Sequence, residues 1–129
     1  MTEVGARWRK PGSAGTDVHF SVPLDWMVSS GLPVPANTCF LITFSWMLTD
    51  LTRDIGATLY IPYTHHTPRV PKPGREYKYQ IAAEGPAGSL VIRPGGLLHS
   101  FGPNQTRNNE RVGLMGGYFA LWMDPTSVD

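Results

Sequence analysis

The sequence predicts an all-β domain, a sandwich or jelly roll of about eight short strands. Fourteen glycines and twelve prolines are spread along 129 residues, and only 16% of the residues are charged, so many short elements must be joined by turns. No segment sustains the 3.6-residue apolar period of an amphipathic helix. Closely spaced turn signals between β-rich runs therefore favour a jelly roll over any helical fold.

Each predicted strand is a short run rich in apolar, β-branched or aromatic residues, bounded by glycine, proline or polar turn residues. In chain order the predicted strands are Ala6–Arg9, Val18–Val22, Thr38–Leu48, Ala57–Ile61, Tyr77–Ala82, Leu90–Arg93, Leu97–Ser100 and Val112–Trp122. The long run Thr38–Leu48 suits a central strand. Leu24–Ser30 is predicted to be one helical turn or a loop. The proline-rich segments Gly31–Asn37 and His65–Gly74 are predicted to be irregular.

Length, charge and cysteine content restrict the class of protein. The chain is predicted to be a single domain over residues 1–129. A net charge of +1 without a large basic cluster argues against a nucleic-acid partner. The longest apolar run, Cys39–Leu48, falls short of the roughly 20 residues that cross a bilayer. The single cysteine, Cys39, excludes an internal disulfide, and no apolar leader is evident, so we expect a soluble cytoplasmic protein.

Two histidines and one arginine are the candidate site residues. His19 and His99 lie in separate β-runs, which closing a jelly roll can bring together around a metal ion. Each could equally be a surface or core histidine with its own hydrogen-bond partner. Arg111 begins the β-run after His99, and its planar fork can engage a carboxylate through two parallel hydrogen bonds. The alternative is an arginine that lies along the surface at a strand start.

A family resemblance is carried by Phe44–His66, FSWMLTDLTRDIGATLYIPYTHH. It resembles the phytanoyl-CoA dioxygenase family, in which a strand leads into an Asp-x-Thr-x-x-x-Gly-Ala-Thr turn and a Pro-Gly-Ser-His sequence; here Pro62-Tyr63-Thr64-His65 takes the latter place. Leu97–His99, Pro103–Thr106 and Arg111 resemble the family's second histidine strand and the segment after it. The resemblance runs from about Arg7 to Phe119, and the stretch Gly88–His99 also fits the second motif of the cupins.

The resemblance implies a double-stranded β-helix, a cupin-like jelly roll, whose active members bind Fe(II) and 2-oxoglutarate. It assigns His19 and His99 to the metal and Arg111 to 2-oxoglutarate, with a one-residue insertion before Arg111. The family's His-x-Asp motif reads His19-Phe20-Ser21 here, so Ser21 stands in the catalytic set where the carboxylate ligand is expected. Related halogenases place a small residue there and bind chloride instead. We therefore expect weak metal binding, or a site completed by water or an exogenous anion.

Three functions remain open. The first is an Fe(II)/2-oxoglutarate-dependent oxygenase or halogenase acting on a small organic molecule. The second is a metal-poor relative that performs an isomerisation, cyclisation or dehydration in the barrel cavity, and the third is a binding module without catalysis. Only eighteen residues precede His19, fewer than in the family, so one barrel face should be bare. We expect a homodimer to cover it.

Overall fold

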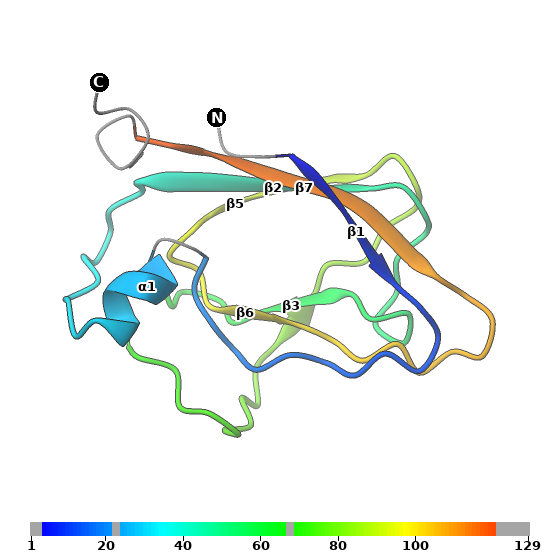
Figure 1. Cartoon of the computed structure of the whole chain (residues 1–129), viewed down its shortest axis with the longest axis horizontal. Helices are drawn as coiled ribbons and strands as arrows, with labels where there is room; N and C mark the ends of the chain where they lie inside the picture. Colours follow the sequence, from blue (N-terminus) through cyan, green and yellow to red (C-terminus); the bar gives the residue numbers. More distant parts are fainter. Residues whose placement is uncertain (1–3, 22–23, 67–68, 121–129) are drawn as a thin grey trace.

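The computed structural model describes residues 4–21, 24–66 and 69–120. Seven strands and one short helix are formed within these residues (Figure 1). They are β1 (Gly5–Arg9), α1 (Leu24–Ser29), β2 (Leu41–Met47), β3 (Thr58–Tyr60), β4 (Ile81–Ala82), β5 (Leu90–Pro94), β6 (His99–Phe101) and β7 (Arg111–Phe119). The all-β prediction is confirmed, and of the two alternatives for Leu24–Ser30, a helical turn or a loop, the helix forms as α1.

The strands form two antiparallel sheets that face each other, with α1 at one end of the space between them (Figure 1). The larger sheet has the order β1-β7-β2-β5, and the smaller has the order β4-β3-β6. Strands β1 and β2 are not neighbours in the larger sheet, because β7, the last strand in the chain, lies between them and pairs with both. This interleaving brings distant segments together and is the architecture of a jelly roll.

Strand β2 shows why the central strand forms where it does. Leu41, Ser45 and Met47 are buried, whereas Ile42 and Trp46 are about half exposed. This alternation with a period of two places one set of side chains in the interior and the other on the outer face of the sheet. Since β2 pairs with both β7 and β5, its backbone groups are satisfied on both sides.

Two predicted strands are reduced to two residues or fewer among the described residues. Within the described part of Val18–Val22, only His19 pairs, in an isolated bridge with His99; Val22 itself lies outside the described residues. Tyr77–Ala82 contributes only Ile81–Ala82, because its partner β3 has three residues and pairs with it through Leu59 and Tyr60. The predicted strand Val112–Trp122 is described as far as Ala120 and corresponds to β7.

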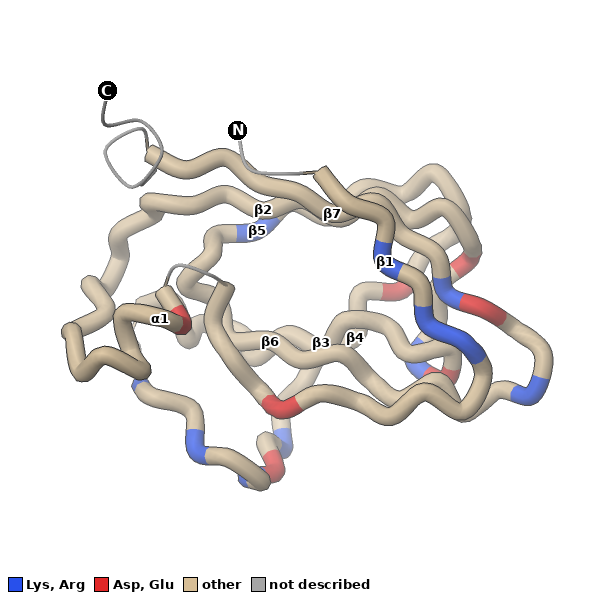
Figure 2. The backbone as a smooth tube through the Cα atoms, viewed as in Figure 1, with Lys and Arg blue, Asp and Glu red and all other residues tan. Residues whose placement is uncertain are grey.

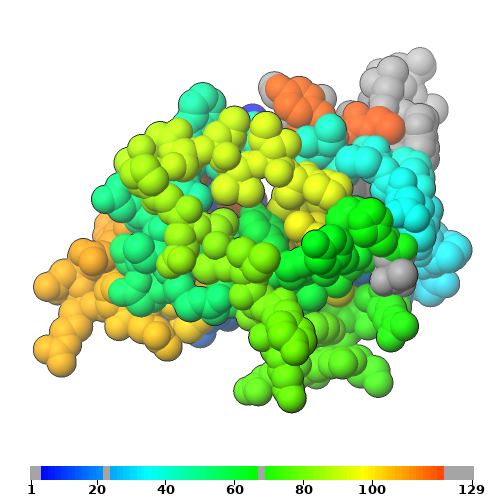
Figure 3. Space-filling view, turned by 180° about the vertical axis from the view of Figure 1, so that it is seen from behind, coloured from blue at the N-terminus to red at the C-terminus, as the bar shows by residue number. Residues whose placement is uncertain are grey.

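The connection after β3 lies on the surface. No helix or strand forms in the described parts of His65–Gly74, residues 65–66 and 69–74, as its prolines predict. In the space-filling view this region, green, stands out along the lower edge of the molecule (Figure 3). Among the described residues no helix is long and apolar enough to cross a membrane.

The core is divided into two apolar clusters. One lies beside α1 and contains Phe20, Leu24, Ile61 and Leu98. The other lies beside the β2–β3 connection and contains Met47, Leu51, Ile55 and Ala57. Seven further described residues are buried although they are polar or charged: Ser45, Thr58, Arg93, His99, Ser100, Asn104 and Arg111. Buried polar groups require partners, so these residues mark the part of the interior where chemistry is possible.

The outer face of the larger sheet carries large apolar side chains in contact with solvent. The exposed residues are Trp8, Ile42, Trp46, Leu90, Ile92 and Tyr118. Strand pairing places Trp46 opposite Leu90, and Ile42 opposite Tyr118, so these side chains form one continuous surface. Contiguous apolar surface of this kind typically marks an interface.

We propose that a second copy of the chain covers this face, because the same apolar side chains on both copies can pack against each other across a two-fold axis. Sedimentation velocity should then give about twice the monomer mass of 14.2 kDa. The substitution Ile92→Glu, at a side chain that is 64% exposed, should weaken the dimer at least about tenfold by burying a charge in the interface. Tyr79→Glu, on a loop outside this sheet, is the matched control. A monomeric parent protein would contradict the proposal.

Candidate functional site

The two candidate histidines face each other across neighbouring segments. The His19 amide donates to the His99 carbonyl oxygen at 2.9 Å, and the His99 amide donates back to the His19 carbonyl oxygen at 3.1 Å. Residues paired in this way on antiparallel segments project their side chains to the same face. The ring centroids are accordingly 4.4 Å apart. The structure thus brings together two residues that the sequence separates by most of its length.

Backbone contacts orient both imidazoles. His19 Nδ1 donates to the Asp17 carbonyl oxygen at 2.9 Å, and His99 Nδ1 donates to the Leu97 carbonyl oxygen at 3.0 Å. A ring whose Nδ1 holds the proton keeps the lone pair on Nε2, which is the arrangement that a metal-ligating histidine requires. In its neutral form each histidine therefore presents an acceptor nitrogen, Nε2, away from the backbone.

The acceptor nitrogen of His99 is already bound by Arg93. Arg93 Nη2 donates to His99 Nε2 at 3.0 Å, and Arg93 Nη1 donates to Ser21 Oγ at 3.0 Å. The guanidinium carbon lies 5.6 Å from the centre of the Tyr60 ring. Arg93 is only 7% exposed and forms no ion pair with a described acidic residue. Burial lowers the pKa of Arg93, because the charged form loses its hydration.

These side chains line one cavity of about 260 Å³. His19, Ser21, Arg93 and His99 all contribute to its wall. Thr43 lines it as well, and its Oγ1 is buried without a hydrogen-bond partner. A buried hydroxyl without a partner is costly, so this atom is available to a ligand. The other lining residues are Arg7, Phe20, Asp25, Phe101, Met115 and Gly116.

The strands bring positive charge and no negative charge to the interior. Figure 2 shows basic positions, blue, on strands of the larger sheet, whereas the acidic positions, red, lie in loops and on α1. The described strands carry four charged residues, all arginines: Arg7, Arg9, Arg93 and Arg111. In the described cavity wall only Asp25, from α1, is acidic. The interior is therefore suited to an anion.

Arg111 lies in the same interior but on the far side of an aromatic ring. Its Nη1 donates to the Gly56 carbonyl oxygen at 2.7 Å, and its Nη2 donates to Thr58 Oγ1 at 3.0 Å. The guanidinium carbon stands 4.6 Å from the centre of the Phe101 ring. Burial, followed by the charge of Arg9, lowers the pKa of Arg111 to about 10. Arg111 is not among the described residues that line the histidine cavity.

A profile of the phytanoyl-CoA dioxygenase (PhyH) family matches residues 25–113. The chain belongs to this family. The predicted resemblance is thereby confirmed. The predicted double-stranded β-helix fold is confirmed as well, because solved structures of non-heme 2-oxoglutarate-dependent enzymes have the same fold as this chain.

One curated relative is similar over nearly the whole chain. Dioxygenase af480 of Aspergillus fumigatus is 34% identical over 126 residues, which is 97% of this chain but 39% of the relative. Three solved structures have the same fold. EvdMO1 has a TM-score of 0.69 and 16% identity, over 93% of this chain and 27% of that one. The non-heme alpha ketoglutarate dependent epimerase SnoN from nogalamycin biosynthesis has a TM-score of 0.67 and 19% identity, over 92% of this chain and 46% of that one. The non-heme monooxygenase ThoJ in a nickel complex has a TM-score of 0.66 and 20% identity, over 92% of this chain and 43% of that one.

The residues of this family member do not assemble the metal site that the resemblance implies. Non-heme iron of this type is held by two histidines and one carboxylate. His19 and His99 supply acceptor nitrogens, but Ser21 stands in the third position, where its oxygen accepts a hydrogen bond from Arg93. Among the described residues, no three His, Cys, Asp or Glu side chains lie close enough to hold a metal ion. The described set therefore does not fit Fe(II).

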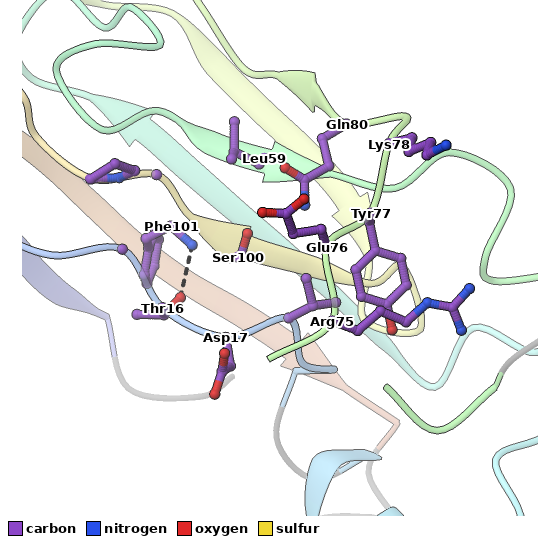
Figure 4. A pocket seen from close by; sticks show the side chains of 14 residues that line it. Thr16, Asp17, Leu59, Arg75, Glu76, Tyr77, Lys78, Gln80, Ser100 and Phe101 are labelled. Atoms are coloured by element: carbon purple, nitrogen blue, oxygen red, sulfur yellow. Dashed lines mark hydrogen bonds between the residues drawn. The ribbon is translucent and has the colours of Figure 1, made fainter. Parts of the chain in front are cut away.

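The nearby carboxylate of Asp17 belongs to a different pocket. A second pocket, of about 390 Å³, is lined by Leu59 and Ser100 of the smaller sheet together with residues from segments 15–18 and 75–80 (Figure 4). Asp17 lines this pocket and not the histidine cavity. The bond from the Phe101 amide to Thr16 Oγ1, dashed in Figure 4, holds segment 15–18 against β6. Asp17 is thus placed on the wrong side to complete a metal site.

Sequence reasoning missed Arg93, Thr43 and Tyr60. Arg93 is the only charged residue between Leu90 and Leu98, and an unpaired charge in an apolar strand is a signal that could have drawn attention to it. Thr43 and Tyr60 carry no such signal, because single hydroxyl-bearing residues are common in strands.

Protonation of His99 should destabilise the fold as the pH falls. Burial, followed by the charges of Arg93 and His19, lowers the pKa of His99 to about 3. An unfolded histidine has a pKa of about 6.5, so between these values the unfolded chain binds a proton that the folded chain excludes. The neutral imidazole stabilises the fold fully above pH 6.5, and this contribution, a few kcal/mol in order of magnitude, is lost toward pH 3.

Urea unfolding at a series of pH values tests this. Between about pH 6.5 and 5, above the range in which ordinary carboxylates titrate, the free energy of unfolding of the parent should fall more steeply than that of His99→Asn. Arg107→Leu, at an exposed residue that does not titrate in this range, should keep the slope of the parent. Equal slopes for the parent and His99→Asn would show that His99 is not the group responsible.

Proposed function

We propose that this chain is a 2-oxoglutarate-dependent oxygenase-like protein that binds a small organic carboxylate between its two sheets, with 2-oxoglutarate as the first candidate. The observation that carries the proposal is the burial of Arg93 and Arg111, two guanidinium groups without an acidic partner among the described residues. A buried cation is costly unless it is paired, and a carboxylate is the group that pairs best with arginine.

Arg111 is the arginine that the family resemblance assigns to 2-oxoglutarate, and its surroundings support that assignment. Two of its nitrogens each donate to a neutral oxygen, of Gly56 and Thr58, which orients the planar group and leaves N–H donors for a ligand. Arg9 is paired in register with Arg111 and also lies over the Phe101 ring. The buried Nε of Arg9 has no hydrogen-bond partner, so a ligand carboxylate here would meet two arginines.

The metal does not enter this proposal. The resemblance implies Fe(II) beside 2-oxoglutarate, and a bound iron would supply the oxidising chemistry of an oxygenase. In this chain the described residues offer two histidines and the neutral Ser21. What its own residues do is bind and orient: the arginines hold the carboxylate, Phe101 separates the Arg111 group from the histidine cavity, and His19 Nε2 is an acceptor for a ligand proton.

Isothermal titration with 2-oxoglutarate, in the presence of a chelator, tests the proposal. The parent should bind it, and Arg111→Leu should weaken binding by at least about tenfold, since a bidentate charge-assisted contact is lost. Arg107→Leu, at an exposed arginine of the β6–β7 turn, is the matched control and should bind as the parent does. Equal affinity for the parent and Arg111→Leu would contradict the assignment of Arg111.

The same protein, titrated anaerobically with Fe(II) and 2-oxoglutarate, distinguishes the oxygenase from the metal-poor alternatives. A weak visible charge-transfer band would identify the iron complex and contradict a metal-independent site. Binding without that band supports the proposal as stated. The chain covers 39% of the length of the curated relative. The titration therefore tests ligand and iron binding by this chain, and the activity of a protein as long as the relative is a separate question.

A further inference from the structure

We infer that Arg93 takes the place of the metal ion in this chain and that its guanidinium is the cation to which a small organic carboxylate binds in the histidine cavity. The inference rests on the proposed function and deepens it, because it names Arg93 as a replacement for the metal ion and the histidine cavity as the place where the carboxylate binds. Three features support Arg93 in this role: its position, its charge, and the unused hydrogen-bonding groups of the cavity wall.

The position of Arg93 excludes a metal ion by geometry. Its two terminal nitrogens contact two of the three places where a metal's ligands are expected, His99 Nε2 and Ser21 Oγ, each at 3.0 Å. The Nε2 atom of a neutral imidazole has one lone pair, and here it accepts the Arg93 hydrogen bond. That lone pair cannot bind a metal at the same time. A divalent ion on His99 would also lie against a guanidinium of like charge.

The net charge of the site is the same as that of the metal site in the family pattern, although different groups supply it. A divalent ion with one carboxylate ligand carries one net positive charge. Arg93 with the neutral Ser21 carries the same net charge at the same place. The two departures from the family pattern therefore compensate each other: the cation is supplied by the protein, and the carboxylate that balanced the metal is absent. An anionic ligand experiences a similar local field in both cases.

The strand pairing explains why the guanidinium is held in place. Arg93 on β5 is the register partner of Thr43 on β2, so their side chains share the interior face of the larger sheet. Ser21 and His99 hold the two terminal nitrogens, and Tyr60 lies beside the planar group. The orientation is thus fixed from several segments of the chain, as a site that binds one ligand in one pose requires.

The remaining groups of the cavity match a carboxylate. Each terminal nitrogen of Arg93 carries a second N–H beyond the bond that it donates. Thr43 Oγ1, buried and without a partner, can donate to a second oxygen of the same ligand. The cavity of about 260 Å³ has room for a small organic acid and not for a large substrate.

Metal titration with four proteins tests the replacement. Cobalt(II), followed anaerobically by its visible absorption, is the probe. The parent and Ser21→Asp alone should not bind it stoichiometrically, because in Ser21→Asp the new carboxylate pairs with Arg93. Arg93→Leu alone should bind weakly through two histidines. The double variant Ser21→Asp, Arg93→Leu should bind tighter than Ser21→Asp by about two orders of magnitude, since a third ligand is added and the competing cation removed.

Tight cobalt binding by the parent, or by Ser21→Asp as strong as that of the double variant, would overturn the inference. So would a folded double variant that binds no better than Ser21→Asp. Circular dichroism and thermal unfolding establish that each variant is folded. If the double variant is not, binding of carboxylates by Arg93→Lys decides instead, because lysine retains the charge and loses the planar bridge.

Carboxylate binding is measured with 2-oxoglutarate and with succinate, with a chelator present. The affinity of the parent should not change on adding chelator, and Arg93→Gln and Arg93→Lys should each weaken it at least about tenfold. Arg107→Leu is again the control. Loss of parent binding on chelation would overturn the carboxylate role of Arg93. If the parent binds no carboxylate at all, the proposed function fails, whereas the cobalt titration still decides whether Arg93 excludes the metal.

Discussion

The site depends on the pairing of the N-terminal segment with β6. His19 and His99 exchange two backbone hydrogen bonds, and the Thr16 and Ser21 amides extend the contact by donating to the carbonyl oxygens of Phe101 and Gly95. This alignment places the two imidazoles on one face and puts Phe20, 1% exposed, in the apolar cluster beside α1. It also brings Ser21 within hydrogen-bonding distance of Arg93. A slip of one residue would reverse every one of these side chains.

The buried arginines of the interior are hydrogen-bonded to neutral groups and not to the acidic side chains that the structure describes. Arg111 is bonded to a carbonyl and a hydroxyl, and Arg93 to a hydroxyl and an imidazole. Aromatic rings of Tyr60 and Phe101 lie beside the two guanidinium groups. Such contacts lower the cost of burial and leave the charge uncompensated, whereas an ion pair with an acidic side chain would neutralise it. The buried guanidinium groups are therefore held in place and can still attract an anion.

Membership of the phytanoyl-CoA dioxygenase family explains the barrel, and it makes the departures from the family pattern informative. Ser21 in place of an acidic ligand, taken alone, indicates only a weakened metal site. Together with an arginine on the facing sheet that bonds both Ser21 and His99, it indicates a different kind of site in the same barrel. Fold and family thus define where a ligand binds, and the side chains at that place decide which ligand it is.

The sequence by itself determined the elements and several of the residues that meet in the site. The apolar and β-branched run that became β2, the turns, and the resemblance around His19, His99 and Arg111 were all evident before the fold was known. It could not determine which face of each strand is the interior. Leu90 and Ile92 are apolar and exposed, whereas Arg93 is charged and buried, so the usual rule that apolar side chains point inward assigns β5 to the wrong face. Only the closure of the two sheets decided that Arg93 meets Ser21 and His99, because that contact joins three segments whose separation along the chain carries no information about their distance in space.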